Sequence, residues 1–176
     1  TGEVKAIVGG RGDKTASKTL NRATDTTRQP GSTFKILAAY SAALDAGGLT
    51  LASVQDDAPY TYAGANGKSV NNYDRRYRGF TTLREAITDS INIVTVKTLA
   101  QAGVSLGWQY VQEYGFTTVD SRDMNEALAL GGITQGVSNL ELTAAYAAIA
   151  NQGTYIKPKF YTKILDHDGN VLIDNT

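Results

Sequence analysis

Ser32 and Lys35 are the two side chains of this 176-residue chain whose types and spacing best suit covalent chemistry. Pro30-Gly31 stands before them and an apolar periodic run follows, so we expect a helix to begin at Ser32. Residues three apart share one face of a helix, which lets Lys35 Nζ reach Ser32 Oγ. A lysine whose pKa is lowered by burial can accept the serine proton, and the N–H groups of the helix N-terminus can stabilise an oxyanion. The pattern therefore suits a serine nucleophile.

Ser-x-x-Lys is a short pattern, and taken alone it more often marks a helix cap followed by a solvated lysine. Serine acyltransferases of this type also use Ser-x-Asn, which occurs here as Ser69-Val70-Asn71 and as Ser90-Ile91-Asn92. We favour Ser90 and Asn92, because a short junction between two helices can direct both side chains into a cleft. The alternative is that these two residues only cap the following helix.

Composition favours neither metal chemistry nor a nucleic-acid partner. His167, the only histidine, falls in a predicted hairpin turn, which argues against a Ser-His-Asp triad. One histidine without cysteine does not favour a zinc site, although carboxylates alone could hold a hard cation, and we expect no cofactor. The 17 basic and 17 acidic residues balance without long blocks of either sign, so we expect no nucleic acid as partner. No apolar run is long enough to cross a bilayer.

Helical periodicity indicates several elements that would position these residues. The helix from Ser32 should stop at Gly47-Gly48, where glycine permits a left-handed conformation. The other predicted helices are one capped by Thr81 or Thr82 that includes Leu83 and Ile87, one over Ile93 to Ala102, and a stretch within residues 125 to 152 that is clearest from Leu140 to Asn151.

Strand and loop signals fill the rest of the chain. Residues 1 to 10 suggest a strand that forms the second half of a hairpin, and residues 11 to 31 suggest a loop. Residues 50 to 80 carry four tyrosines and many turn residues, which suggests an irregular segment packed over the domain. Residues 159 to 174 suggest two strands joined by a turn at Asp168-Gly169.

Four motifs follow one another along the chain: Asn21-Arg22-Ala23, Arg28-Gln29-Pro30-Gly31-Ser32-Thr33-Phe34-Lys35, Asn72-Tyr73-Asp74 with Tyr77 and Gly79, and Asp89-Ser90-Ile91-Asn92. Together they resemble the transpeptidase domains of class A penicillin-binding proteins. The run from Ala144 to Tyr155 also resembles a late helix of that family. The resemblance implies an α/β fold of the α+β type, in which a helix-rich subdomain carries part of the antiparallel sheet of the serine β-lactamase and penicillin-binding-protein transpeptidase fold.

The resemblance also implies a peptidoglycan D,D-transpeptidase. Ser32 would attack the D-Ala-D-Ala carbonyl of a stem peptide, with Lys35 as its base, and the acyl group would pass to an amine of a neighbouring strand. Ser90 would relay a proton towards the leaving amine, and Asn92 would bind the peptide. β-Lactam antibiotics would acylate Ser32 as substrate mimics. The family's location implies the extracytoplasmic face of the bacterial membrane, with an anchor and a glycosyltransferase domain upstream.

One family motif, Lys-Thr-Gly or Lys-Ser-Gly on a strand, occurs nowhere in residues 1 to 176. In the family this strand lines the cleft opposite the serine, binds the substrate carboxylate and gives the second oxyanion N–H. We therefore expect residues 1 to 176 to be one transpeptidase domain that is incomplete at both ends and inactive alone. Its partner would be the segment that carries this motif, possibly as a separate chain, which could pair with residues 3 to 9. Those residues could instead pair with Lys159 to Leu165 or with a neighbouring chain.

Three other functions stay open from the sequence. A D,D-carboxypeptidase and a serine β-lactamase share both motifs and differ in whether water attacks the acyl-enzyme. A β-lactamase of the commonest class needs a loop carboxylate to activate that water, whereas Glu126 precedes an apolar helical pattern. From a different class, the chain could be a non-catalytic binding module or fragment.

Overall fold

A computed structural model describes residues 1–63 and 67–176, so a small part of the expected irregular segment lies outside the described residues. The chain divides into two compact units. The central unit comprises residues 28–137, and the terminal unit comprises residues 1–27 and 138–176. The short strands β1 (Thr27–Arg28) and β6 (Val137–Ser138) fall at the two points of the sequence where the chain passes from one unit to the other.

The predicted helix at Ser32 is present in the central unit, but its turns are not all α-helical. It begins as the 3-10 turn η1 (Gly31–Thr33), widens into the π-helical segment η2 (Ile36–Tyr40) and ends as α1 (Ser41–Asp45). The wide turn is held because both the backbone N–H and the hydroxyl of Ser41 donate to Ile36 O, the latter over 2.8 Å. Such π segments are common at functional sites.

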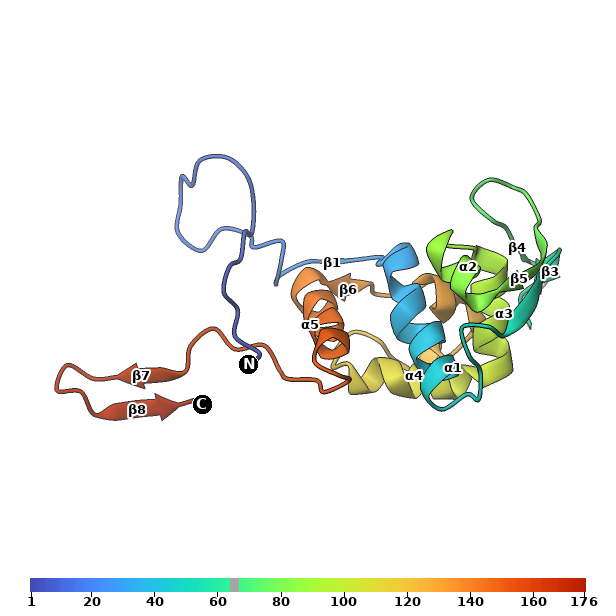
Figure 1. Ribbon diagram of the computed structural model, residues 1–176. Helices are drawn as coiled ribbons and strands as arrows, with labels where there is room; N and C mark the ends of the chain where they lie inside the picture. Colours follow the sequence, from blue (N-terminus) through green and yellow to red (C-terminus); the bar gives the residue numbers. More distant parts are fainter. Residues whose placement is uncertain (64–66) are drawn as a thin grey trace. The chain divides into compact units, whose positions relative to one another are not determined.

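The two predicted helices that flank residues 89–91 are confirmed. Helix α2 (Leu83–Thr88) begins with a capping box between Thr82 and Glu85, and α3 (Asn92–Ala102) ends at Gly103, whose φ is 104°. Helix α4 (Val104–Glu113) follows at once and was not predicted. Its Gly107 lies against Ala38, where a Cβ atom would come within 2.4 Å of the Ala38 carbonyl oxygen. Figure 1 shows these helices gathered in the central unit.

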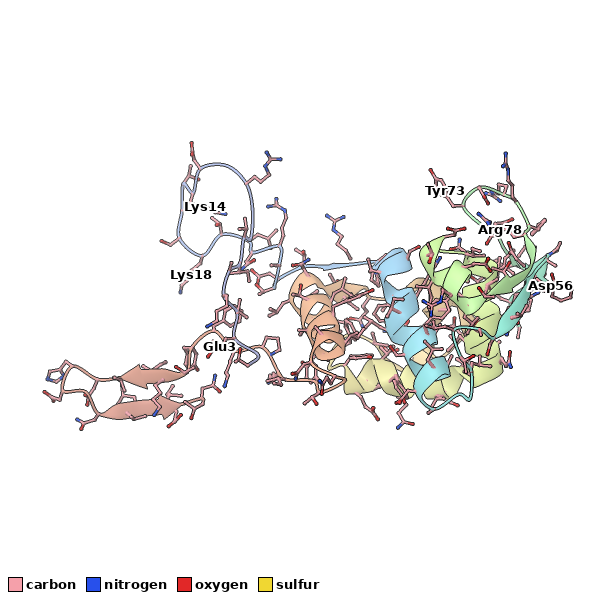
Figure 2. All side chains as sticks on the ribbon, in the orientation of Figure 1. Glu3, Lys14, Lys18, Asp56, Tyr73 and Arg78 are labelled. Carbon is pink, nitrogen blue, oxygen red and sulfur yellow. The ribbon has the colours of Figure 1, made fainter. Side chains whose placement is uncertain are left out.

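Two short antiparallel pairs occupy the segment predicted to be irregular. Strand β2 (Val54–Asp57) pairs with β5 (Gly79–Thr82), and β3 (Tyr60–Thr61) pairs with β4 (Ser69–Val70). The loop from β4 to β5 is exposed except at the buried Asn72, and Tyr73 within it is 100% accessible (Figure 2). The predicted absence of helix holds for the described part of this segment, and the strands are too short to give an alternating pattern.

The helical stretch predicted within residues 125 to 152 is confirmed in its clearest part, Leu140 to Asn151, and is wrong for residues 131–138. After the 3-10 turn η3 (Ser121–Asp123), a second turn η4 (Glu126–Leu130) stops at Gly131. Gly131 and Gly136 have φ values of 72° and 73°, which a helix does not accept. Helix starts again only at α5 (Asn139–Ala150), which Ser138 and Glu141 cap.

The terminal unit holds α5 and the predicted C-terminal hairpin. Strand β7 (Lys163–Leu165) pairs antiparallel with β8 (Val171–Asp174) around a turn that contains Gly169 at a φ of 86°. The first strand starts at Lys163 rather than at Lys159. No helix within the described ranges is long and apolar enough to cross a membrane.

The strand predicted over residues 1 to 10 is wrong for most of its length. One parallel bridge joins Glu3 to Lys159, through Val4 N to Lys159 O and Lys159 N to Gly2 O, both 2.9 Å. An extended segment needs a hydrogen-bonded neighbour along its length, and Lys159 supplies one position. The expected pairing of residues 3 to 9 with residues 159 to 165 is therefore limited to this bridge.

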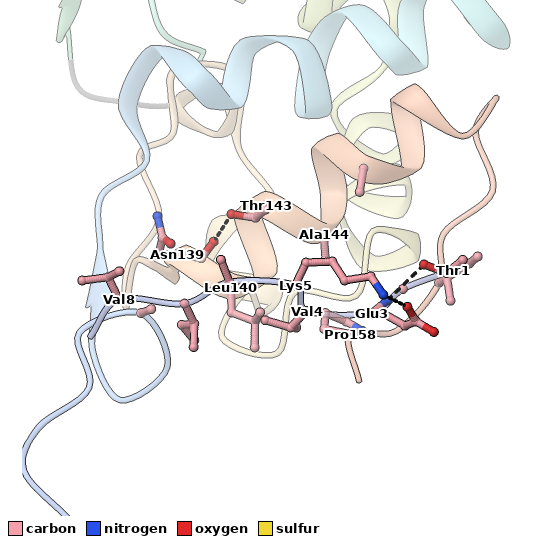
Figure 3. A pocket seen from close by; sticks show the side chains of 16 residues that line it. Thr1, Glu3, Val4, Lys5, Val8, Asn139, Leu140, Thr143, Ala144 and Pro158 are labelled. Atoms are coloured by element: carbon pink, nitrogen blue, oxygen red, sulfur yellow. Dashed lines mark hydrogen bonds and ion pairs between the residues drawn. The ribbon is translucent and has the colours of Figure 1, made fainter. Parts of the chain in front are cut away.

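A cavity of about 670 Å³ lies in the terminal unit (Figure 3). Residues 1–8 line one part of it, and residues from the first turns of α5 line another. None of the residues from which we expect chemistry lines this cavity.

Candidate active site

The start of the Ser32 helix is fixed by the segment that follows η4. The Gln29 side chain bonds the backbone of Ile133 in both directions, donating to its carbonyl oxygen and accepting from its N–H over 3.0 Å. A Cβ atom on Gly131 would come within 2.6 Å of both N and O of Gly31, so the two backbones are in close contact. These contacts set the position of Ser32, which follows Gly31 directly.

Ser32 and Lys35 differ sharply in exposure. Ser32 is exposed on the first turn of its helix, whereas Lys35 is only 3% exposed. Within the described residues no hydrogen bond joins Ser32 Oγ to Lys35 Nζ. Catalytic contacts are often long until substrate binds, so the pair still has the one-face spacing that proton transfer needs.

Lys35 Nζ instead donates to three oxygens at the junction of α2 and α3. It lies 2.9 Å from Ser90 Oγ, 2.6 Å from the Ser90 carbonyl oxygen and 2.6 Å from Asn92 Oδ1. The three sequence-predicted residues Lys35, Ser90 and Asn92 therefore form one cluster, although more than fifty residues separate Lys35 from the other two.

Burial changes the acid–base behaviour of Lys35. Removal of its ammonium group from water lowers the pKa from 10.5 to about 8. At pH 7 on the order of one lysine in ten is then a neutral amine, compared with fewer than one in a thousand at an unperturbed pKa. Lys35 can therefore act as a base near neutral pH.

Ser90 occupies a backbone position that usually belongs to glycine. Its φ is 54°, and it follows α2 in a Schellman arrangement in which Ser90 N donates to Ile87 O over 3.3 Å and Ile91 N donates to Ala86 O over 2.9 Å. Ile91, at 2% exposure, packs in the same apolar cluster as Ala86. A left-handed conformation costs a serine about 1 kcal/mol, and it brings both oxygens of Ser90 to the lysine.

The competing pattern Ser69-Val70-Asn71 contributes through its backbone. Ser69 lies in β4 opposite Thr61, and the Asn71 carbonyl oxygen accepts a hydrogen bond from Asn92 Nδ2 over 2.8 Å. That bond fixes the amide of Asn92 with its oxygen towards Lys35.

Glu126 forms hydrogen bonds outside this cluster. Its carboxylate accepts hydrogen bonds from Tyr60 Oη over 2.8 Å and from Ala63 N over 2.9 Å. In the described part of the chain no group of three or more histidine or acidic side chains is arranged to hold a metal ion.

Comparison with known proteins decides the family. The family model described as the penicillin-binding protein transpeptidase domain matches residues 1–175. The chain belongs to this family. Among class A relatives, it is 43% identical to penicillin-binding protein 1F of Bacillus subtilis over 175 residues, and 41% identical to penicillin-binding protein 1A of Neisseria flavescens over 176 residues. These matches cover 99% and 97% of this chain but only 23% and 21% of the relatives.

Solved structures agree on the α+β transpeptidase fold that the sequence predicts. Penicillin-binding protein 1A from Haemophilus influenzae is similar over 88% of this chain and 23% of its own, with a TM-score of 0.75 and 34% identity. PonA1 from Mycobacterium tuberculosis, solved in complex with penicillin V, matches over 90% of this chain and 44% of its own, with a TM-score of 0.76 and 22% identity. The curated relatives are longer proteins, and the present chain spans about a quarter of their length.

Proposed function

We propose that this chain carries the acylation machinery of a peptidoglycan D,D-transpeptidase. One observation carries the proposal: a buried Lys35, three residues after an exposed Ser32 at a helix start, contacts both Ser90 and Asn92. Membership of the penicillin-binding protein transpeptidase family supports the same reaction class.

In the proposed acylation, neutral Lys35 takes the proton of Ser32 Oγ as that oxygen attacks the carbonyl of the penultimate D-alanine. The C–N bond to the terminal D-alanine then breaks, and the leaving amine takes up the transferred proton. An amine of a neighbouring strand next attacks the ester carbonyl and gives one proton to neutral Lys35. The C–O bond to Ser32 breaks as the new amide forms, and Lys35 passes that proton to Ser32 Oγ. This route makes the serine both nucleophile and leaving group, with one lysine as base and acid.

The hydrogen bonds around Lys35 restrict how the proton moves. A neutral amine has two N–H groups and one lone pair, and among its three contacts only the Ser90 hydroxyl can donate. The two N–H groups therefore donate to the Ser90 carbonyl oxygen and to Asn92 Oδ1. The lone pair can then accept a proton from the hydroxyl of Ser32 during the attack, or exchange one with the hydroxyl of Ser90. Ser90 is thus suited to relay a proton between Lys35 and the leaving amine.

The remaining parts of the proposal follow from family membership. Stem peptides and β-lactams are the proposed ligands of Ser32, with Asn92 as a contact for the bound acyl group. A Lys-Thr-Gly strand, as a later segment or a separate chain, is the proposed source of the carboxylate-binding residues and the second oxyanion N–H. The proposed location is the extracytoplasmic face of the membrane, by means of an upstream anchor.

Labelling of the full-length protein with a fluorescent penicillin tests this function against its rivals. The transpeptidase predicts a stable covalent adduct, and new amide bonds between stem peptides and an added amine acceptor. Rapid loss of the adduct would indicate a β-lactamase, and release of D-alanine without amide formation would indicate a carboxypeptidase. A protein that takes no label would be a scaffold, and the proposal would be wrong.

A further inference from the structure

The geometry points to Asn72 as a positioning residue for Lys35, Ser90 and Asn92, with Asp57 fixing the orientation of its amide. This inference rests on the proposed function, because it assigns a role within the same site. Both side chains lie outside the four proposed catalytic and binding positions. Asn72 is 3% exposed, and Asp57 is fully buried.

The oxygen of the Asn72 amide caps helix α3 from twenty residues earlier in the chain. Helix α3 has Ile91 as its N-cap, and no side chain at that position accepts a hydrogen bond. Asn72 Oδ1 instead accepts from Asn92 N over 3.0 Å and from Ile93 N over 3.2 Å. Two of the N–H groups that a helix start leaves unpaired are thus satisfied, and one belongs to a proposed site residue.

The nitrogen of the same amide is fully used on its other side. Asn72 Nδ2 donates to Asp57 Oδ1 over 2.8 Å, with Oδ2 at 3.0 Å, and to the Arg76 carbonyl oxygen over 2.8 Å. Asp57 is held in turn by Arg78, whose backbone N–H donates to Oδ2 over 2.9 Å and whose guanidinium lies 3.8 Å away. The carboxylate accepts only, so it requires the amide nitrogen to face it and the amide oxygen to face α3.

This requirement selects asparagine at position 72. Aspartate would place a second carboxylate against Asp57 and against a carbonyl oxygen, and alanine would leave the buried donors and acceptors unpaired. Loss of the cap frees the first residues of α3, and Asn92 Oδ1 and both oxygens of Ser90 then lose their fixed positions around Lys35. Water would reach the lysine, and its pKa would move back towards the ordinary value because burial is the cause of its shift.

The test measures acylation rate by a fluorescent penicillin against pH, together with the melting temperature, in the full-length protein. In the curve of acylation rate against pH, Asn72→Ala should move the midpoint of the acidic limb upwards by about one pH unit. The acylation rate at pH 7 should then fall on the order of tenfold more than the rate at high pH. The matched control is Asn71→Ala, because the Asn71 side chain is exposed and its carbonyl remains; its midpoint should stay at the wild-type value.

A purely structural role gives a different outcome. It would lower the melting temperature and the active fraction of Asn72→Ala without moving the pH midpoint, because every folded molecule would keep the same lysine environment. If penicillin acylates Asn72→Ala and the pH midpoint is unmoved, the role of Asn72 is wrong but the proposed function still stands. A wild-type protein that no penicillin acylates would reject the proposed function instead.

A charge-conserving exchange tests the part played by Asp57 and covers the case in which Asn72→Ala does not fold. Asn72→Asp alone should impair acylation strongly. Adding Asp57→Asn restores a donor facing an acceptor, so the double variant should recover part of the loss and move the midpoint back towards wild type. Recovery is expected to be partial because the Arg76 carbonyl still faces a carboxylate. A double variant no better than Asn72→Asp would refute the role of Asp57.

Discussion

Lys35 can act as a base because it is buried and its hydrogen-bond partners are uncharged. Its three contacts are a hydroxyl and two carbonyl-type oxygens. Such neighbours accept hydrogen bonds from the amine but leave burial free to lower its pKa to about 8. A carboxylate at the same place would stabilise the ammonium form and remove the base.

Lys35→Arg keeps the positive charge but should nearly abolish acylation by penicillin, because guanidinium does not release its proton near neutral pH. In the wild-type protein the rate should fall about tenfold per pH unit below about 8, since protonation of Lys35 removes the base. Stopped-flow acylation from pH 6 to pH 10 measures both. A Lys35→Arg protein within a few-fold of the wild-type rate would show that Lys35 is not the base.

Ser90→Gly should separate stability from activity. Glycine relieves a φ of 54°, so the melting temperature should stay level or rise, by an amount that corresponds to up to about 1 kcal/mol. Acylation should fall on the order of a hundredfold, because the proton relay is lost. Ser90→Ala is the matched control: it also loses the hydroxyl but keeps the strain. Ser90→Gly with wild-type acylation would remove Ser90 from the mechanism.

At the scale of elements, the close contact between Gly131 and Gly31 connects η4 to the start of the Ser32 helix. The sequence predicted neither this contact nor the end of η4 at Gly131. A helical pattern runs through residues 125 to 152, and glycine alone does not say whether a helix bends, stops or permits a close approach. The contact depends on a segment one hundred residues away from Gly31.

Gly131→Ala should therefore damage both folding and acylation. The change forces a left-handed alanine and a Cβ atom 2.6 Å from N and O of Gly31, so we expect a loss of about 2 to 4 kcal/mol in the free energy of unfolding. Gly48→Ala provides the control, because Gly48 has the same φ of 72° and open space around it. Equal losses in the two variants, measured by chemical denaturation, would show that the contact with Gly31 has no importance.

At the scale of the whole molecule, local patterns predicted what local interactions determine. The Ser32 helix, the N-cap of α2 at Thr82 and the end of α3 at Ala102 depend on residues within a few positions of each other. The helix and the end were predicted, and Thr82 was one of the two caps proposed. The cap of α3 by Asn72 depends on contacts across twenty residues, and no periodicity indicates it. The strand expected over residues 1 to 10 failed for the same reason, because a strand needs partners that its own residues cannot specify.

Mapping the penicillin adduct in the full-length protein tests the central claim most directly. After brief labelling, digestion and mass spectrometry, the acyl group should lie on Ser32, and Ser32→Ala should take no label while it keeps the wild-type melting temperature. Lys35, Ser90 and Asn92 would then surround the acylated residue as proposed. An adduct on any other side chain, or persistent covalent labelling of Ser32→Ala, would contradict the account.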